Sequence, residues 1–305
     1  MKNIKLLMVL MLTVVIGLVG CTNKAIVEEP ELETPVVQAD EIEEEVDKNI
    51  IAGTLMSAEL LDLFDITPVG VLTTEKSLPE RYNGVTQIGS PMKPDLEVVV
   101  SLNPDLYVSD SNLKEGIDEI FGGNNIETMF LTNNSYEDIF KNIEDIGEYL
   151  NKTDKADTII SEMRKEEKDI LDSISGKESP NVLVLFGTPE SFMIATPNSY
   201  TGSLVEKLGA TNVAADLAKG KPMPYLPFSL ETIADLNPDI ILRLTHVSPE
   251  ISKKAFDAEF EKGFWTNLDA VKNEKVYDLD PNYFGVSANL RMMTALEELA
   301  AILYD

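Results

Sequence analysis

Cysteine and histidine are almost absent from this chain of 305 residues, which contains Cys21, His246 and no other residue of either type. A single cysteine excludes an intrachain disulfide and a thiolate cluster for zinc or an iron–sulfur centre. A single histidine excludes metal sites built from several imidazoles. These absences leave room for one well-placed imidazole that acts as a single metal ligand.

Basic residues are also scarce, since 25 Lys and Arg stand against 53 Asp and Glu and the formal net charge is -28. Because a phosphate backbone is bound through a basic surface, this balance argues against nucleic acid as a partner. The chain has no Gly-x-Ser-x-Gly elbow, phosphate loop or Gly-x-Gly-x-x-Gly fingerprint. A Ser-His-Asp triad would have to use His246, and no serine is marked as its nucleophile. We therefore expect no enzymatic activity and keep a lipid-anchored hydrolase only as a second alternative.

One long apolar run is present, at residues 6–19, after Lys2 and Lys5. A basic start, an apolar centre and small residues before position 21 are typical of an export signal, and the run is short for a membrane span. Residues 18–21, Leu-Val-Gly-Cys, resemble a bacterial lipobox. This resemblance implies a signal peptide over residues 1–20, cleavage before Cys21 and a lipid on its sulfur. A plain secretory signal with an incidental Cys21 is the alternative.

Residues 21–48 form a low-complexity segment that is strongly acidic. Between Glu28 and Asp47 it carries many carboxylates and no basic residue. Repulsion among like charges favours an extended segment over a packed one. We interpret it as a lipidated tether between the membrane and a folded part.

The remaining residues, 49–305, exceed a typical single domain. Short apolar runs alternate with amphipathic stretches, which predicts βα units and a parallel sheet in each half. Ser57 is the expected N-cap of the first helix. We predict strands at residues 49–53, 68–71, 105–108, 126–131, 181–186 and 239–242, and helices at residues 57–64, 94–100 and 203–209.

Two segments of the chain echo each other. Residues 96–106 and residues 230–240 each place Leu-Glu at a helix start, then Leu-Asn-Pro-Asp and an apolar strand. With similar neighbours on both sides, this repeat predicts two related lobes, at residues 49–152 and 176–305. Glu97 and Glu231 occupy the repeated Leu-Glu positions, where the helix dipole alone also favours a carboxylate.

Between the lobes, residues 153–175 have apolar residues at helical spacing, with one gap at Glu167. At 1.5 Å per residue the segment would run about 30 Å as a helix. We predict one long helix that joins the lobes. A surface helix within a single lobe is the alternative.

Met92 and His246 each follow a predicted strand. Met92 lies in the Gly-Ser-Pro-Met-Lys-Pro loop of residues 89–94, outside any helical apolar stripe, and His246 follows the strand at residues 239–242. Taken alone, the methionine favours core packing and the histidine a structural role. If the lobes face each other, however, both side chains approach one cleft, and thioether with imidazole is a known axial pair for haem iron.

The sequence resembles the haem-binding lipoproteins of bacterial iron-uptake ABC transporters, in particular those of the iron-regulated surface determinant systems of Gram-positive bacteria. The resemblance covers nearly all of the chain from about residue 50 to residue 303. Its main anchors are Leu-Pro-Glu-Arg-Tyr at residues 78–82, Gly-Ser-Pro-Met at 89–92, Ser-Tyr-Thr-Gly at 199–202 and Asn-Pro-Asp-Ile-Ile-Leu-Arg-Leu-Thr-His at 237–246. The chain departs from the family in the acidic tether and at residues 222–227.

The resemblance implies an α/β fold of two Rossmann-like lobes joined by one long helix, as in class III periplasmic binding proteins. It implies that Met92 and His246 ligate haem, and that Glu97 and Glu231 dock the protein on an ABC permease served by an ATPase. It also implies a lipid-anchored protein on the outer face of the cell membrane, which upstream cell-surface haem-relay proteins would supply. Haem propionates need cations, hydroxyls or free N–H groups, for which the candidates are Lys76, Arg81, Tyr82, Ser199, Tyr200, Thr201 and Arg243.

Two questions stay open at this point. Tyr283 and Phe284 fit either stacking on the macrocycle or core packing. An iron–siderophore or cobalamin is the alternative ligand within the same fold, and it would need no axial pair.

Overall fold

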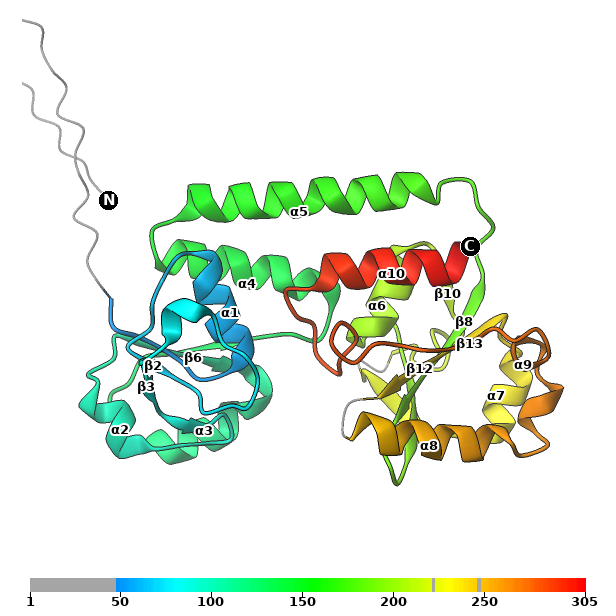
Figure 1. The fold of residues 1–305 in the computed structure, drawn as a ribbon, viewed down its shortest axis with the longest axis horizontal. Helices are drawn as coiled ribbons and strands as arrows, with labels where there is room; N and C mark the ends of the chain where they lie inside the picture. Colours follow the sequence, from blue (N-terminus) through cyan, green and yellow to red (C-terminus); the bar gives the residue numbers. More distant parts are fainter. Residues whose placement is uncertain (1–47, 221–222, 246–247) are drawn as a thin grey trace, which may run out of the picture. The chain divides into compact units, whose positions relative to one another are not determined.

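The structure is a computed structural model, and it describes residues 48–220, 223–245 and 248–305. The predicted signal peptide, Cys21 and the tether as far as residue 47 lie outside the described residues. Figure 1 shows two groups of strands, with the long helix α5 (Thr153–Ser173) running above both. Within the described ranges, none of the helices combines the length and the apolar character needed to cross a bilayer.

The first sheet has five strands in the order β3-β2-β1-β6-β7. Every neighbouring pair is parallel, as predicted for this half of the chain. Strand β1 lies in the middle, so the chain adds β2 and β3 on one side of it and then β6 and β7 on the other. Because the strands are parallel, their carboxyl ends lie at one edge of the sheet, where open α/β sheets bind their ligands. The strands are β1 (Ile50–Ala52), β2 (Gly70–Val71), β3 (Thr86–Gln87), β6 (Leu106–Asp110) and β7 (Thr128–Leu131).

The second sheet has the order β11-β9-β8-β12-β13, with β10 also paired to β8. It is mixed, so the prediction of a parallel sheet is wrong for β9 and β11, which pair antiparallel. The reason is the short connection from β8 to β9, closed by Thr188 and Ser191, because a parallel pair needs a much longer crossover. The strands are β8 (Asn181–Gly187), β9 (Phe192–Ala195), β10 (Thr211–Asn212), β11 (Tyr225–Pro227), β12 (Ile240–Thr245) and β13 (Val276–Asp278).

Ten α-helices lie in the described part of the chain. In the first lobe they are α1 (Leu55–Leu63), α2 (Leu96–Ser101), α3 (Lys114–Phe121) and α4 (Tyr136–Tyr149). After α5 follow α6 (Tyr200–Lys207), α7 (Leu230–Leu236), α8 (Pro249–Phe260), α9 (Asp269–Lys272) and α10 (Met292–Tyr304). Short 3-10 turns are η1 (Glu80–Tyr82), η2 (Ser111–Leu113) and η3 (Trp265–Asn267).

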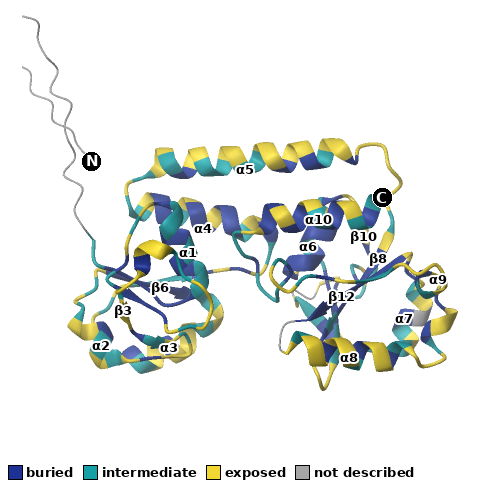
Figure 2. Ribbon diagram, in the orientation of Figure 1, coloured by how far each residue is buried: buried dark blue, intermediate teal, exposed yellow. Residues whose placement is uncertain are grey.

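Alternation along the strands divides the interior into three apolar clusters. In β1, Ile50 and Ala52 join a large cluster that also takes Val182 and Val184 of β8, so this cluster is shared by both lobes. Ile51, between them, faces a smaller cluster private to the first lobe. Leu183 and Leu185 of β8 face a third cluster, private to the second lobe. Figure 2 shows the buried faces of α4, α6 and α10 that cover the shared side.

Helix α1 begins earlier than its sequence suggested. Ser57 is not the N-cap; Thr54 caps the helix, and Ser57 is the third helical residue of a reciprocal capping box. The Ser57 backbone N–H donates to Thr54 Oγ1 at 3.2 Å, and the Thr54 N–H donates to Ser57 Oγ at 2.9 Å. Both residues satisfy backbone donors that a helix start leaves open.

The repeated segments have the same local structure in both lobes. Asn103 and Asn237 follow their helices with positive φ values of 46° and 34°. Asp105 then accepts a hydrogen bond from the N–H of Asn49 at 2.7 Å, and Asp239 accepts one from the N–H of Asn181 at 2.8 Å. Each aspartate therefore ties the start of its own strand to the start of the lobe's first strand.

Helix α5 packs against α4 on one part of its length and α10 on another. Its 21 residues correspond to about 30 Å. The gap that Glu167 makes in its apolar stripe is not an exposed position, because Glu167 is only 7% exposed. The limits of the lobes and of the linking segment remain predictions.

Candidate functional site

Met92 lies at the tip of a β-hairpin on the carboxyl edge of the first sheet. The hairpin pairs β4 (Gly89–Ser90) with β5 (Lys93–Pro94), so that only Pro91 and Met92 form the turn. Met92 is 78% exposed and is the most exposed of the large apolar residues that the structure describes. Its side chain is therefore not core packing, and its thioether is free to meet a ligand.

The base of this hairpin is held firmly. Thr73, just after β2, donates its N–H to the Gly89 carbonyl at 2.7 Å, and Asp95 donates to the Ile88 carbonyl at 2.7 Å. Gly89 has a φ of +94°, and a Cβ there would come within 2.9 Å of the Lys93 carbonyl oxygen. Glycine is required at this position, both by the backbone conformation and by space. The Met92 turn is thus set in place by the backbone around it.

His246 lies outside the described residues, and its role as a ligand remains a prediction. The residue before it, Thr245, is the last of β12 and pairs with Gly187, the last of β8. The described part of the chain therefore reaches the carboxyl edge of the second sheet at Thr245. Beyond it, Ile251 in the first turn of α8 is 58% exposed, which is unusual for a large apolar side chain.

Lys76 and Arg81 follow β2 in the first lobe and have different surroundings. Lys76 is exposed, and the described residues provide no ion-pair partner for its ammonium group. Arg81 forms ion pairs with Asp62 at 2.8 Å and Asp65 at 3.0 Å. The hydrogen bond that Arg81 donates to Asp65 raises the pKa of Arg81 above its ordinary value.

Tyr82 is 4% exposed and turns its hydroxyl inward. Its Oη lies 2.9 Å from the Ala58 carbonyl oxygen and 3.0 Å from that of Ile66. Burial raises the pKa of this phenol strongly. These contacts support a structural role, in which Tyr82 fastens the η1 turn to α1.

Ser199, Tyr200 and Thr201 open helix α6 and are all buried. Ser199 caps the helix by accepting from the Gly202 N–H at 3.0 Å, and it donates to the Thr196 carbonyl at 2.7 Å. The hydroxyls of Tyr200 and Thr201 are buried and form no hydrogen bond with the residues that the structure describes. Burial of all three side chains favours packing over direct contact with a large ligand.

Arg243 of β12 is 8% exposed and belongs to an ion-pair network inside the second lobe. Its guanidinium donates to both carboxylate oxygens of Asp278, at 2.6 and 2.7 Å, and to Asp257 at 2.9 Å. Burial lowers the pKa of Arg243, but the hydrogen bonds and charges of these two aspartates outweigh it, so the pKa is raised. The geometry assigns this arginine to the second lobe's interior.

Glu97 and Glu231 are exposed on equivalent helices of the two lobes. Asp95 caps α2 by accepting from the N–H of Glu97 at 3.0 Å, and Ser229 caps α7. Each glutamate stands in the first turn of its helix, and no described residue forms a hydrogen bond or an ion pair with its carboxylate. Phe284, in contrast, is fully buried. Of the two roles considered for it, stacking on a macrocycle and core packing, its burial supports core packing.

Comparison with known proteins identifies the family. A model of the periplasmic binding proteins matches residues 50–283. The chain belongs to this family of binding proteins. It is 33% identical over 306 residues to the high-affinity heme uptake system protein IsdE of Staphylococcus aureus (strain bovine RF122 / ET3-1), covering all of this chain and 99% of that one.

Solved structures agree with this assignment. An ABC transporter substrate-binding protein from Listeria monocytogenes EGD-e has a TM-score of 0.78 and 36% identity, covering 85% of this chain and 99% of that chain. S. aureus IsdE complexed with heme has a TM-score of 0.75 and 34% identity with the same coverage. S. aureus SirA complexed with staphyloferrin B, at 20% identity over 84% of this chain and 92% of that chain with a TM-score of 0.67, shares the fold alone.

Two features of this binding protein were missed in the sequence. Met223 and Ile251 are large apolar side chains on the second-lobe surface, 49% and 58% exposed. A methionine between Pro222 and Pro224 was a signal for the first, because it resembles the setting of Met92. The second missed feature is a network of polar side chains around Glu167. Its signal in the sequence was the gap that Glu167 makes in the apolar stripe of α5.

Proposed function

We propose that this protein binds haem and delivers it to an ABC importer. The observation that carries this proposal is Met92, 78% exposed at the tip of a braced hairpin on the carboxyl edge of the first sheet. A thioether held in solvent by a fixed turn is costly for a soluble surface and suits a soft metal ligand. Full-length similarity to IsdE, a heme uptake protein, supports the same ligand.

Iron would be held by one axial pair, the Met92 thioether and the His246 imidazole, one from each lobe. Methionine with histidine is a ligand set known for haem iron. Within the described ranges there is no group of three or more His, Cys, Asp or Glu residues suited to a metal ion. The apolar side chain of Ile251, close in sequence to His246, would add to the lining against a flat macrocycle.

For a haem propionate we favour Lys76 among the predicted contacts. It is exposed at the carboxyl side of β2, on the same edge as the Met92 hairpin, and no carboxylate of the described residues pairs with it. Arg81 and Arg243 already hold aspartates, and Tyr82, Ser199, Tyr200 and Thr201 are buried. An exposed ammonium group on this edge gives a carboxylate a charge-assisted hydrogen bond at little cost.

Delivery would use Glu97 and Glu231, one on each lobe, as docking points for arginines of the permease, whose ATPase drives import. The lipid on Cys21 would keep the protein at the outer face of a Gram-positive cell membrane, within reach of upstream haem-relay proteins. The tether would raise the local concentration of loaded protein at the permease.

Ligand class is tested by titrating the full-length chain with ferric haem, a ferric siderophore and cobalamin. We expect a saturable Soret band with haem and no saturable change with the other two. Saturable binding of the siderophore or cobalamin, without haem binding, would overturn the proposal in favour of the alternative ligand.

Docking is tested by growth on haem as the only iron source. Glu97→Gln and Glu231→Gln should slow growth while haem affinity is kept, because these side chains lie outside the ligand site. Glu119→Gln is the matched control, since Glu119 is an exposed carboxylate on α3 outside the repeated segments. Equal growth of all three variants would remove docking from these residues.

A further inference from the structure

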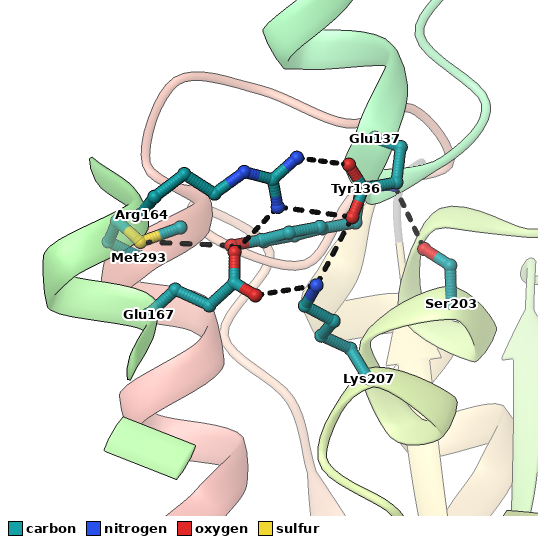
Figure 3. A network of polar contacts seen from close by, with 7 residues as sticks. All are labelled: Tyr136, Glu137, Arg164, Glu167, Ser203, Lys207 and Met293. Carbon is teal, nitrogen blue, oxygen red and sulfur yellow. Dashed lines mark hydrogen bonds and ion pairs between the residues drawn. The ribbon is translucent and has the colours of Figure 1, made fainter. Parts of the chain in front are cut away.

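A network of polar side chains joins four helices of the molecule. Figure 3 shows its seven residues: Tyr136 and Glu137 on α4, Arg164 and Glu167 on α5, Ser203 and Lys207 on α6, and Met293 on α10. Helix α4 belongs to the first lobe, whereas α6 follows the first two strands of the second sheet. The network therefore crosses between the lobes at the level of the linking helix.

Glu167 is the centre of the network. Its side chain is 9% exposed, and it accepts from Lys207 Nζ at 2.5 Å, Arg164 Nη1 at 2.6 Å and the Tyr136 hydroxyl at 3.0 Å. Burial raises the pKa of Glu167, but these three donors together hold it below its ordinary value. A carboxylate with three donors is stable in a buried setting only while its partners stay in place.

The charges of the network balance. Arg164 also pairs with Glu137 of α4, and its guanidinium lies 3.6 Å from the centroid of the Phe140 ring. Lys207 reaches Glu137 at 3.2 Å as well as Glu167. Two carboxylates and two cations are thus paired in both directions, and each cation bridges two carboxylates.

The second lobe's share comes from one face of α6. Ser203 and Lys207 are four residues apart and so lie on the same side of the helix. Ser203 Oγ accepts the backbone N–H of Tyr136 at 3.0 Å, a donor that the start of α4 leaves open. Lys207 Nζ lies 5.2 Å from the centroid of the Tyr136 ring. Rotation of one lobe against the other would break these contacts together.

In the described part of the chain, the other hydrogen bonds and ion pairs between the lobes are fewer. Arg291, just before α10, pairs with Glu59 of α1 at 3.0 Å, with the arginine half exposed. The Ala288 N–H donates to the Asn133 carbonyl at 2.7 Å. Lys207 pairs directly with Glu137 of the first lobe and, at a more buried position, with Glu167 of the linking helix, whose side chain is 9% exposed against 17% for Glu59.

We propose that this polar network is a clamp that fixes the two lobes relative to each other, and that the Lys207–Glu167 pair is its central contact. The clamp would thereby position the Met92 turn against the carboxyl end of β12. This inference rests on the proposed function, because the positioned groups are those that would hold haem. A fixed separation means that the ligand meets a preorganised site and orders little on binding. Loosening the clamp should therefore speed ligand loss more than it lowers stability.

The first arm of the test measures the distance between the lobes without any ligand. In a full chain that carries Cys21→Ser, exposed Ser101 of α2 and Asp235 of α7 are changed to cysteine and spin-labelled for distance measurement. We expect a narrow distribution that broadens in Lys207→Met. Lys168→Met is the matched control, because Lys168 pairs with Asp172 on the same helix α5 and touches no second element in the described chain. An unchanged distribution in Lys207→Met overturns the clamp.

The second arm measures haem dissociation into excess apomyoglobin. Lys207→Met should release haem about tenfold faster than wild type, a coupling usual for residues in one ion-pair network, while Lys168→Met is unchanged. A broader distance distribution with an unchanged dissociation rate overturns the positioning role. Failure of wild type to bind haem refutes the proposed function instead, and the distance arm still decides the clamp.

A milder variant guards against loss of folding. Glu137→Gln removes the more exposed carboxylate of the network and leaves Glu167 paired to both cations. It should fold normally and give a smaller change of the same sign in both arms. A melting curve of each variant separates a shift in lobe geometry from general destabilisation.

Discussion

The segment 96–106 in the first lobe and the segment 230–240 in the second pass from a capped helix through a left-handed asparagine into a parallel strand. Each ends in an aspartate that ties its strand to the lobe's first strand. The neighbours of the two segments differ: the braced hairpin with exposed Met92 stands directly before the segment in the first lobe, whereas in the second lobe the segment continues through β12 to Thr245 at the carboxyl edge of the sheet. Repetition thus supplies the scaffold, and divergence at the carboxyl edges supplies the ligand chemistry.

The lobes also differ in how they hold charge. Arg81 of the first lobe pairs with aspartates at an exposed position, whereas Arg243 of the second lobe is buried between Asp278 and Asp257. Exposed pairs contribute little to stability, while a buried group that loses its partner is costly. We therefore expect Arg243 to contribute much more than Arg81 to the stability of the protein.

The largest effect that we predict on stability comes from this contrast. Arg243→Leu removes the buried guanidinium from Asp257 and leaves Asp278 with Lys253 alone, and it should lower the free energy of unfolding by about 3 kcal/mol. Arg81→Leu is the matched change in the first lobe and should have a much smaller effect. Urea denaturation of both variants measures the difference; equal losses would show that burial does not separate the two arginines.

The next effect concerns the Met92 hairpin. Gly89→Ala should cost about 1–2 kcal/mol, because alanine is strained at positive φ and its Cβ meets the Lys93 carbonyl. Gly84→Ala is the control, since Gly84 has a φ of +89° but open space around it. Only the change at Gly89 should also weaken haem binding. A haem titration beside the urea curves checks both points, and equal haem affinity in the two variants would count against a braced ligand turn.

Much of this architecture was readable from the sequence. The short apolar runs at residues 50–52 and 181–186 predicted buried strands, and the Leu-Asn-Pro-Asp repeat predicted two related lobes. Strands β9 and β11 escaped prediction because they are short and the latter ends at Pro227, so pairing across the sheet, not local propensity, makes them strands. The aspartate partners of Arg243 come from 14 and 35 residues away, and no local pattern reveals them.

At the candidate site, the sequence predicted best those features that depend on local backbone conformation. Glycine and proline around Met92 predicted a loop, and the structure shows a two-residue turn that exposes the side chain. The buried hydroxyls of Tyr82 and Tyr200 could not be told from ligand contacts, because burial depends on the packing of distant elements. The gap at Glu167 was visible, but its partners on α4 and α6 were not.

A smaller effect tests the equivalence of the repeats. Asp105→Ala and Asp239→Ala each remove the acceptor of a strand-starting N–H and should each cost about 1 kcal/mol. Asp239 also accepts from the Asn181 side chain at 3.0 Å, so its loss should be the slightly greater of the two. Urea midpoints measure both; a strong effect in one lobe alone would break the comparison.

The smallest effect is expected at two buried tyrosine hydroxyls, one chosen from each lobe, that have no hydrogen-bond partner among the described residues. Tyr107→Phe and Tyr200→Phe remove groups that form no hydrogen bond, so stability should stay the same or rise slightly. Tyr82→Phe is the control, because it removes a hydroxyl that is bonded to a backbone carbonyl and should destabilise the protein. Thermal melting of the three variants measures this order, and destabilisation in all three would indicate unseen partners for Tyr107 and Tyr200.

The central claim is that haem iron is held between the Met92 thioether and the His246 imidazole. The most direct measurement is an optical titration with haem of wild type, Met92→Ala and His246→Ala, each in the oxidised and reduced states. We predict a saturable low-spin spectrum for wild type, and a high-spin or weakened spectrum for each variant. A saturable spectrum that neither substitution changes would contradict this ligand pair, and no saturable spectrum in wild type would contradict haem binding itself.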